Sequence, residues 1–356
     1  MTRAVIGATP QPKPHVYIVL LNWNGWSDTI ECLESVFRLN YPEFTVIVCD
    51  NASSDGSIHQ IEQWASGYLP ASCKNPELAY LSQPPIPKSI PFISLSSPLD
   101  LEKRYPPGSL VLIQTGANLG FAGGNNVGIR FALSRGDCDY VWLLNNDTVV
   151  DPHALSAMIE MTEANQAMGI CGSQLRDYAH PTEVHTMGGR RYSRWTGRSS
   201  PLPAANTPHL STIPEAPDYV EGASMLIRSS LLREIGLLEE GYFLYFEELD
   251  LIERSKMKCC FGYAPDSIVF HKEGASIGSA KLRTNRSTLS EYYLARNRII
   301  FTAKFYPVLL PPVFAAVMGS GIQRLLLGNP RSAKGVLRGL IAGLQDLSRI
   351  NVMRQR

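Results

Sequence analysis

The stretch Tyr140-Val141-Trp142-Leu143-Leu144-Asn145-Asn146-Asp147-Thr148 decides the fold class of this chain. Five mostly apolar residues run directly into three polar ones, which is typical of a strand that is buried on both faces and ends at the rim of a sheet. In open α/β sheets, ligands bind at the carboxyl ends of the strands. A carboxylate at such an end suits a hard divalent cation shared with the phosphates of a substrate. Asn and Asp also favour turns, so the stretch alone fits an ordinary polar turn equally well.

Segments typical of strands and helices alternate around this stretch. The expected strands are residues 16–21, 45–49, 110–113 and 140–144, and the expected helices are 29–39, 57–64, 126–133 and 152–164. This alternation predicts an α/β fold with a mostly parallel sheet flanked by helices. Two segments rich in Pro and Ser interrupt it. Residues 70–108 are expected to be a surface insertion, and residues 190–217 a flexible loop that is either a plain surface loop or a lid.

The composition is that of a globular chain, with 44% hydrophobic residues, 18% charged residues and a formal net charge of +1 over 356 residues. This balance produces no global field directed at nucleic acid, so no nucleic-acid partner is expected. The seven cysteines show no Cys-x-x-Cys spacing, which indicates free thiols in a reducing, cytoplasmic compartment. Residues 1–14 are expected to form a flexible tail rather than a signal peptide, and no run long enough to span a membrane is expected.

Residues 277–356 are expected to form a C-terminal helical region. Its segment 332–347 combines apolar residues such as Val336 and Leu340 with the basic residues Lys334 and Arg338, which predicts an amphipathic helix. Such a helix fits either an anionic membrane surface or ordinary packing on the rest of the protein. Any peripheral contact with the inner face of the plasma membrane is therefore expected within residues 290–350.

Polar clusters follow the four expected strands. They are Asn22-Trp23-Asn24-Gly25, the stretch from Asp50-Asn51 to Ser57, the glycine-rich stretch from Asn118 to Asn126, and Asn145-Asn146-Asp147. Amides and carboxylates can read base edges and ribose hydroxyls, and glycines let backbone N–H groups approach a phosphate. Each cluster alone fits a turn, but four at one rim indicate a nucleotide site. The glycine fingerprint of dinucleotide-binding folds and the Walker phosphate loop are both absent from the sequence.

An acidic segment follows an aromatic run in the second half of the chain. Glu247, Glu248 and Asp250 stand directly after Tyr242-Phe243-Leu244-Tyr245-Phe246. One interpretation is a general base whose pKa is raised because aromatic neighbours desolvate it. The other is a helix N-terminus, where carboxylates compensate the helix dipole and Asp250 pairs with Arg254. The spacing leaves both interpretations open.

Together these motifs resemble the family 2 glycosyltransferases of the GT-A fold, especially their bacterial rhamnosyltransferase-like branch. The matching segments span most of residues 15–276. The resemblance implies a Rossmann-like GT-A domain over residues 15–276 with a C-terminal helical extension. It also implies an inverting hexosyltransferase that takes a sugar from a nucleotide-diphospho-sugar in cell-surface polysaccharide assembly. From the branch alone, L-rhamnose is the expected sugar, and a saccharide or lipid-linked saccharide is the expected acceptor.

The resemblance also implies roles for single residues. The donor would be bound by residues of the four polar clusters, namely Asn22, Asn24, Asp50, Asn51, Asn118, Gly123, Gly124, Asn125 and Asn146. Mg²⁺ or Mn²⁺ would be held by Asp147, in a motif that has Asn where the family usually has its first Asp, and by His271 in the segment 271–276. Glu248 would be the base, with Asp250 and Glu247 as the other catalytic candidates.

Other functions stay open beside this one. A non-catalytic sugar-nucleotide-binding protein would bind a nucleotide without transferring the sugar, and the retained acids argue against it. A dinucleotide-dependent oxidoreductase would require the missing glycine fingerprint. A processive polysaccharide synthase would be expected to carry spanning helices and a Gln-x-x-Arg-Trp motif, and the sequence lacks that motif.

Overall fold

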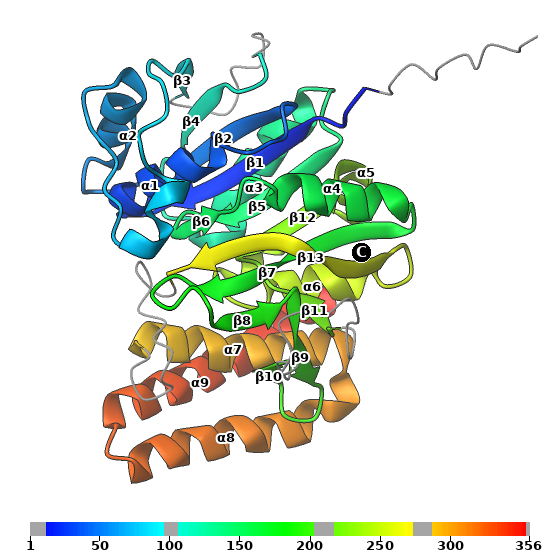
Figure 1. Ribbon diagram of the computed structural model, residues 1–356. Helices are drawn as coiled ribbons and strands as arrows, with labels where there is room; N and C mark the ends of the chain where they lie inside the picture. Colours follow the sequence, from blue (N-terminus) through cyan, green and yellow to red (C-terminus); the bar gives the residue numbers. More distant parts are fainter. Residues whose placement is uncertain (1–11, 96–105, 203–216, 273–286, 354–356) are drawn as a thin grey trace, which may run out of the picture.

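The computed structural model describes residues 12–95, 106–202, 217–272 and 287–353 (Figure 1). Across these residues, a sheet of ten strands runs in the order β3-β4-β2-β1-β5-β12-β7-β13-β6, with β8 paired to β7. A smaller sheet has the order β10-β9-β11. In Figure 1 the small sheet lies between the large sheet and a layer of three C-terminal helices.

The strands of the large sheet are β1 (Val16–Asn22), β2 (Phe44–Asp50), β3 (Phe92–Leu95), β4 (Leu110–Gln114), β5 (Tyr140–Asn145), β6 (Thr148–Val150), β7 (Met168–Asp177), β8 (Val184–Met187), β12 (Ser224–Arg228) and β13 (Cys260–His271). Those of the small sheet are β9 (Gly189–Ser193), β10 (Arg198–Pro201) and β11 (Tyr219–Val220). The helices are α1 (Trp26–Val36), α2 (Ser57–Ser66), α3 (Gly120–Ser134), α4 (Ala154–Ala164), α5 (Ser229–Ile235), α6 (Glu247–Ser255), α7 (Thr288–Phe305), α8 (Leu310–Leu326) and α9 (Pro330–Met353). Short 3₁₀ turns are η1 (Pro76–Leu81), η2 (Glu240–Tyr242) and η4 (Pro307–Leu309).

The four expected strands are β1, β2, β4 and β5, and they lie parallel and adjacent in the order β4-β2-β1-β5. Alternate residues of β1 enter opposite layers, as strand geometry requires. Ile18 packs with the layer that contains α1 and α2, whereas Val19 packs with the layer that contains α3. The prediction of a mostly parallel α/β sheet flanked by helices is confirmed. The register pairs Asn22 with Asp50, so the polar strand ends meet at one edge.

The glycine-rich stretch after β4 belongs to a helix and not to a turn. Helix α3 begins at Gly120, six residues before the predicted start at Asn126. A Cβ atom at Gly124 would collide with the Leu21 side chain, and one at Gly128 would lie 2.6 Å from Val19 Cγ1. These glycines therefore allow α3 to pack closely on β1, which low helix propensity alone did not predict.

The two segments rich in Pro and Ser contain strands. Within residues 70–108, β3 pairs in parallel with β4, and Leu78 and Leu81 are buried. Within residues 190–217, β9 and β10 form an antiparallel pair. The prediction of a loop over residues 190–217 missed β9 and β10, because these short polar strands show no apolar alternation. The remaining parts of these two segments, and most of the predicted N-terminal tail, lie outside the described residues.

The C-terminal helices pack closely through a line of glycines on α9. A Cβ atom at Gly339 would overlap the Tyr292 carbonyl oxygen of α7, and one at Gly335 would lie 2.6 Å from Thr288 O. Val336 and Leu340 of the expected amphipathic helix are buried in this bundle. Helix packing is thus confirmed for this face of α9.

Helix α8 differs from expectation. The segment Pro307–Leu326 is long and apolar enough to cross a membrane by length and composition, and 17% of its most apolar window is buried. By length and composition this helix is a candidate span that the sequence analysis did not expect. Pro311 and Pro312 lie in the first turn of α8, where proline is tolerated, so they do not interrupt the helix.

Candidate active site

A cavity of about 550 Å³ lies at the carboxyl ends of the parallel strands. The predicted site residues that line it are Asn51, Asn118, Asn146, Asp147, Glu247, Glu248 and His271. Residues from the small sheet and from α7 and α8 complete the lining, among them Arg190, Tyr219, Tyr293 and Arg298. Strand ends, a helix start and two C-terminal helices therefore share one cavity.

Asn22 and Asp50 do not line the cavity, but their hydrogen bond connects the ends of the neighbouring strands β1 and β2. Asn22 is fully buried and donates through Nδ2 to Asp50 Oδ1 at 2.7 Å. Asn146 Nδ2 donates to Asn22 Oδ1 at 3.3 Å and to Thr29 Oγ1 at 2.9 Å, which connects β1 to the turn after β5. Asn24 adopts a left-handed backbone with φ of 52°, and its side chain accepts from the backbone N–H of Ser54. These residues support the shape of the rim.

Asn51 and Asn118 connect the end of β2 to the start of α3. Asn51 Nδ2 donates to Asn118 Oδ1 at 3.0 Å, and the Leu119 N–H donates to Asn51 Oδ1 at 3.0 Å. Gly123, Gly124 and Asn125 do not line the cavity among the described residues. Asn125 instead bonds to the Phe121 carbonyl within its own helix. Gly124 lies against the Leu21 side chain of β1, and the donor contacts of Gly123, Gly124 and Asn125 stay predictions.

Asp147 and His271 are 124 residues apart in the sequence and lie side by side in the fold. His271 Nε2 lies 3.1 Å from Asp147 Oδ1 and 3.3 Å from Asn145 Nδ2. The next residue, Lys272, is bound to Asp28 and Glu31, which anchors the end of β13. Burial raises the pKa of the Asp147 carboxyl, but the charge and hydrogen bond of His271 outweigh it and lower that pKa below its usual value.

The spacing of these two side chains fits a shared cation. Two ligands bound at about 2.1 Å and at right angles lie about 3.0 Å apart, close to the observed 3.1 Å between Asp147 Oδ1 and His271 Nε2. In the described part of the chain, no group of three or more His, Cys, Asp or Glu residues surrounds a common point. Phosphates and water would complete the coordination, as is usual for Mg²⁺. The rest of the predicted motif, residues 273–276, lies outside the described residues.

A strained turn directly before α6 positions Glu247 and Glu248 at the cavity. Phe243, Tyr245 and Phe246 have positive φ angles of 65°, 67° and 78°, and helix α6 starts at the next residue. Such conformations persist only where the surroundings enforce them. Asn297 of α7 does so, because its Nδ2 donates to the carbonyls of Tyr242, Leu244 and Tyr245. The C-terminal helices therefore determine where α6 begins.

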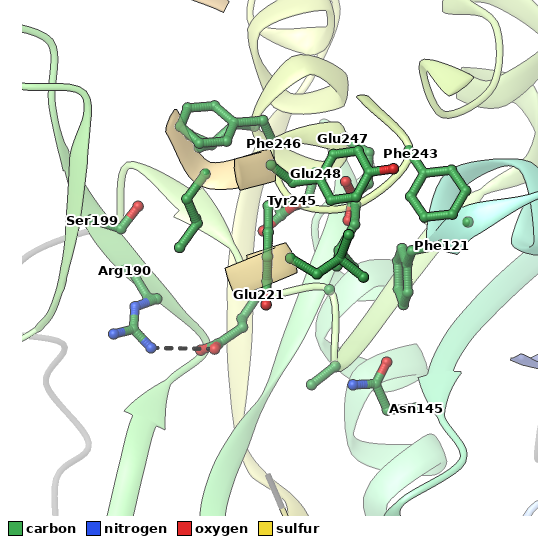
Figure 2. Close-up of a pocket in the computed structure, with 18 of the residues that line it drawn as sticks. Phe121, Asn145, Arg190, Ser199, Glu221, Phe243, Tyr245, Phe246, Glu247 and Glu248 are labelled. Atoms are coloured by element: carbon green, nitrogen blue, oxygen red, sulfur yellow. Dashed lines mark hydrogen bonds and ion pairs between the residues drawn. The ribbon is translucent and has the colours of Figure 1, made fainter. Parts of the chain in front are cut away.

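The carboxyl groups of Glu247 and Glu248 line the cavity and influence each other's ionisation (Figure 2). Burial and the charge of Glu248 raise the pKa of Glu247 well above its usual value. Burial also raises the pKa of Glu248 to about 7, and the charge of Glu221 adds to that rise. With a pKa of about 7, Glu248 can take a proton near neutral pH, which is the property of a general base.

Asp250 does not line the cavity. Its carboxylate accepts from Arg254 Nε at 2.6 Å, from Lys304 Nζ at 2.6 Å and from the Tyr242 hydroxyl at 3.0 Å. The pairing of Asp250 with Arg254, one of the two interpretations of the acidic segment, is confirmed. This carboxylate serves the packing of α6 against α7.

Glu221 and Arg190 are site residues that the sequence analysis did not single out. Arg190 Nη1 lies 3.3 Å from Glu221 Oε1, and Figure 2 shows the pair on the opposite side of the cavity from Phe121 and Phe243. Arg190 was missed because its segment was expected to be a loop. The one available signal for Glu221 was its place directly before Gly222 and the strand β12.

The chain matches the family model described as "Glycosyl transferase family 2" over residues 17–84 and 100–233. It is 26% identical over 161 residues to a low-salt glycan biosynthesis hexosyltransferase from Haloferax volcanii, covering 45% of this chain and 51% of that protein. It is also 26% identical over 199 residues to an N-acetylglucosaminyl-diphospho-decaprenol L-rhamnosyltransferase from Mycobacterium tuberculosis, covering 49% and 62%. The chain thus spans 51% to 62% of the length of these curated relatives.

Among solved structures, a mannosyltransferase from Pyrobaculum calidifontis in complex with GDP-Man and Mn²⁺ is similar over 95% of this chain and 89% of that chain, with a TM-score of 0.51 and 14% identity. The N-terminal fragment 1–349 of Staphylococcus aureus TarS is similar over 94% and 83%, with a TM-score of 0.50 and 11% identity. At these identities the likeness shows the fold, which is the GT-A fold.

Proposed function

The chain belongs to glycosyl transferase family 2, and we propose that it transfers a sugar from a nucleotide-diphospho-sugar to a hydroxyl group of a glycan acceptor. One observation carries the proposal. A single cavity joins a pair of side chains suited to a cation, Asp147 and His271, to a carboxyl group of raised pKa, Glu248. Sugar transfer requires both functions, because charge develops on the leaving diphosphate while the acceptor hydroxyl loses a proton.

The rim of the sheet would hold the donor. Asn51 and Asn118 present amide groups for the nucleoside, and the bonds of Asn22 and Asp50 keep the neighbouring strand ends in place. Asp147 and His271 would hold Mg²⁺ or Mn²⁺, which when bound neutralises negative charge on the diphosphate. Positioning by these residues brings the reacting groups together and avoids the entropy cost of a random encounter.

Glu248 would act as the base. It takes the proton of the acceptor hydroxyl as the acceptor oxygen forms a bond to the anomeric carbon. The bond from that carbon to the diphosphate oxygen breaks on the opposite face, so the anomeric configuration inverts. Glu247, whose pKa is raised well above its usual value by burial and by the charge of Glu248, would interact with Glu248 in the cavity wall. Glu248 lines the cavity, and its buried Oε2 atom has no hydrogen-bond partner among the described residues.

The acceptor is proposed to be a lipid-linked saccharide at the inner face of the plasma membrane, and the sugar L-rhamnose. The name of the Mycobacterium tuberculosis relative supports both. The outer surface of α8 and α9 supports the proposed contact with the membrane. Its exposed apolar residues are Ile322, Leu325, Leu326, Leu337, Ile341 and Leu344. The exposed basic residues Arg331, Lys334 and Arg338 lie on the same helix α9, which complements the charge of anionic lipids.

The test is a transfer assay with a panel of nucleotide-sugars that includes dTDP-rhamnose, a lipid-linked saccharide acceptor and Mn²⁺. We expect a product of inverted configuration. Asp147→Ala and Glu248→Gln should each lower turnover at least about a hundredfold, whereas the exposed control Asp266→Asn should match the wild type. Nucleotide binding without any transfer or donor hydrolysis would support the non-catalytic alternative instead.

A further inference from the structure

Three arginines gather where the cavity meets the C-terminal helices. Arg298 lies on α7, Arg324 on α8 and Arg198 on β10, and all three line the cavity. The stem of Arg298 packs against the turn before β10, since a Cβ atom at Gly197 would lie 3.2 Å from Arg298 Cγ. Three elements that are distant in sequence thus bring guanidinium groups to one wall of the cavity.

Arg298 has donor capacity that the described residues do not use. Its buried Nε atom has no hydrogen-bond partner among them. Burial lowers the pKa of this guanidinium to about 10, and the charges of Arg198 and Arg324 act in the same direction. A buried donor without a partner costs free energy. An anionic ligand would remove that cost.

Arg324 is partly satisfied. Its Nη2 pairs with Glu291 at 2.7 Å and its Nη1 donates to the Ser320 carbonyl at 2.9 Å, while its buried Nε has no partner in the described part of the chain. Glu291 is thus the carboxylate that pairs with Arg324. Among the other acids of the cavity, Glu221 pairs with Arg190, and Glu247 interacts with Glu248.

Apolar side chains continue from this wall to the outside of the molecule. Leu289 and Leu294 of α7 line the cavity beside the arginines, and Leu289 is half exposed. On α8, Ile322 and Leu325 are exposed on either side of the cavity-lining residues Gln323 and Arg324. A ligand that fits this wall has an anionic head and a hydrocarbon chain.

We propose that Arg198, Arg298 and Arg324 bind the diphosphate group of the acceptor lipid, with its hydrocarbon chain leaving along α8. This assignment rests on the proposed function, because it names the chemical class of the acceptor. Guanidinium groups suit it, since they bind phosphate oxygens through paired N–H donors. The residues are separate from Asp147 and His271, which are proposed to serve the diphosphate of the donor.

The test measures binding of farnesyl diphosphate, farnesol and inorganic pyrophosphate by titration calorimetry, with a chelator present so that no divalent ion reaches Asp147. The wild type should bind farnesyl diphosphate at least about tenfold more tightly than either of the other probes. Arg298→Gln and Arg198→Gln should each weaken that binding at least about tenfold. The control Lys258→Gln, an exposed residue outside the cavity and outside α8 and α9, should leave it unchanged, and a loss in Asp147→Ala would instead point to the donor site.

Two results would overturn the assignment. One is wild-type affinity in folded Arg298→Gln and Arg198→Gln proteins, and the other is loss of binding in Asp147→Ala, which would place the anion in the donor site. If the wild type binds inorganic pyrophosphate as tightly as farnesyl diphosphate, the proposed contact between the hydrocarbon chain and α8 is contradicted. The proposed function fails separately, through the absence of sugar transfer, since this binding requires neither donor nor metal.

Discussion

At the scale of single residues, Glu248 and Asp250 stand two positions apart in opposite surroundings. Glu248 lines the cavity with a pKa raised to about 7 by burial, and a base works in its deprotonated form. Turnover should therefore rise with pH up to about 7 and then level off. Glu248→Gln should lower turnover at least about a hundredfold and remove this rise. A pH–rate profile at saturating donor measures both, and an unchanged profile in the variant would exclude Glu248 as the base.

Asp250 should behave differently, because its buried carboxylate holds Arg254 and Lys304. Asp250→Asn removes the charge that these two cations face, and breaking a buried pair typically costs about 3–5 kcal/mol. Urea unfolding should show a loss of this size, while the exposed control Asp266→Asn stays within about 0.5 kcal/mol of the wild type. A stable but inactive Asp250→Asn protein would instead give Asp250 the role of the base.

Sequence reasoning could identify these acids but not separate their roles. The segment 247–250 and the resemblance marked all three carboxylates as catalytic candidates. The partners that distinguish them, Lys304 and Glu221, lie far away in sequence and come together only in the fold. Arg298 belongs to no motif, so its place in the cavity could not be predicted.

At the scale of elements, the close packing of α9 on α7 through glycines predicts how glycine substitutions change stability. Gly339→Ala places a methyl group against the Tyr292 carbonyl of α7 and should destabilise the protein by about 1–3 kcal/mol. A Cβ atom at Gly319 of α8 would have no neighbouring atom within 4 Å. Gly319→Ala should therefore stabilise the protein by roughly 0.5–1 kcal/mol, since alanine favours a helix. Thermal unfolding compares the two variants. Equal effects would show that α7 and α9 are not closely packed.

The elements that sequence predicted well are those whose apolar pattern is buried on both sides. The strands β1, β2, β4 and β5 are of this kind, and all four were found within two residues of their predicted ends. The misassigned elements depend on tertiary packing instead. The glycines of α3 suggest a turn until β1 lies against them, and β9 and β10 show no alternation that a single sequence could reveal.

At the scale of the whole molecule, the outer surface of α8 and α9 should bind anionic membranes. Replacing both Ile322 and Leu326 by Asp removes apolar area and adds negative charge, so binding to vesicles that contain phosphatidylglycerol should weaken at least about tenfold. Vesicle co-sedimentation measures this effect. Met257→Asp is the matched control, because Met257 is 92% exposed and lies after α6. Unchanged sedimentation of the double variant would rule out this surface.

The central claim is that Asp147 and His271 hold a divalent ion that binds the diphosphate of the donor. Titration calorimetry of Mn²⁺ into the protein saturated with a nucleoside diphosphate tests it most directly. The account predicts that the wild type binds Mn²⁺ at least about tenfold more tightly than Asp147→Ala, and that omitting the nucleotide weakens wild-type binding by a similar factor. Equal Mn²⁺ affinity in the wild type and Asp147→Ala would contradict it.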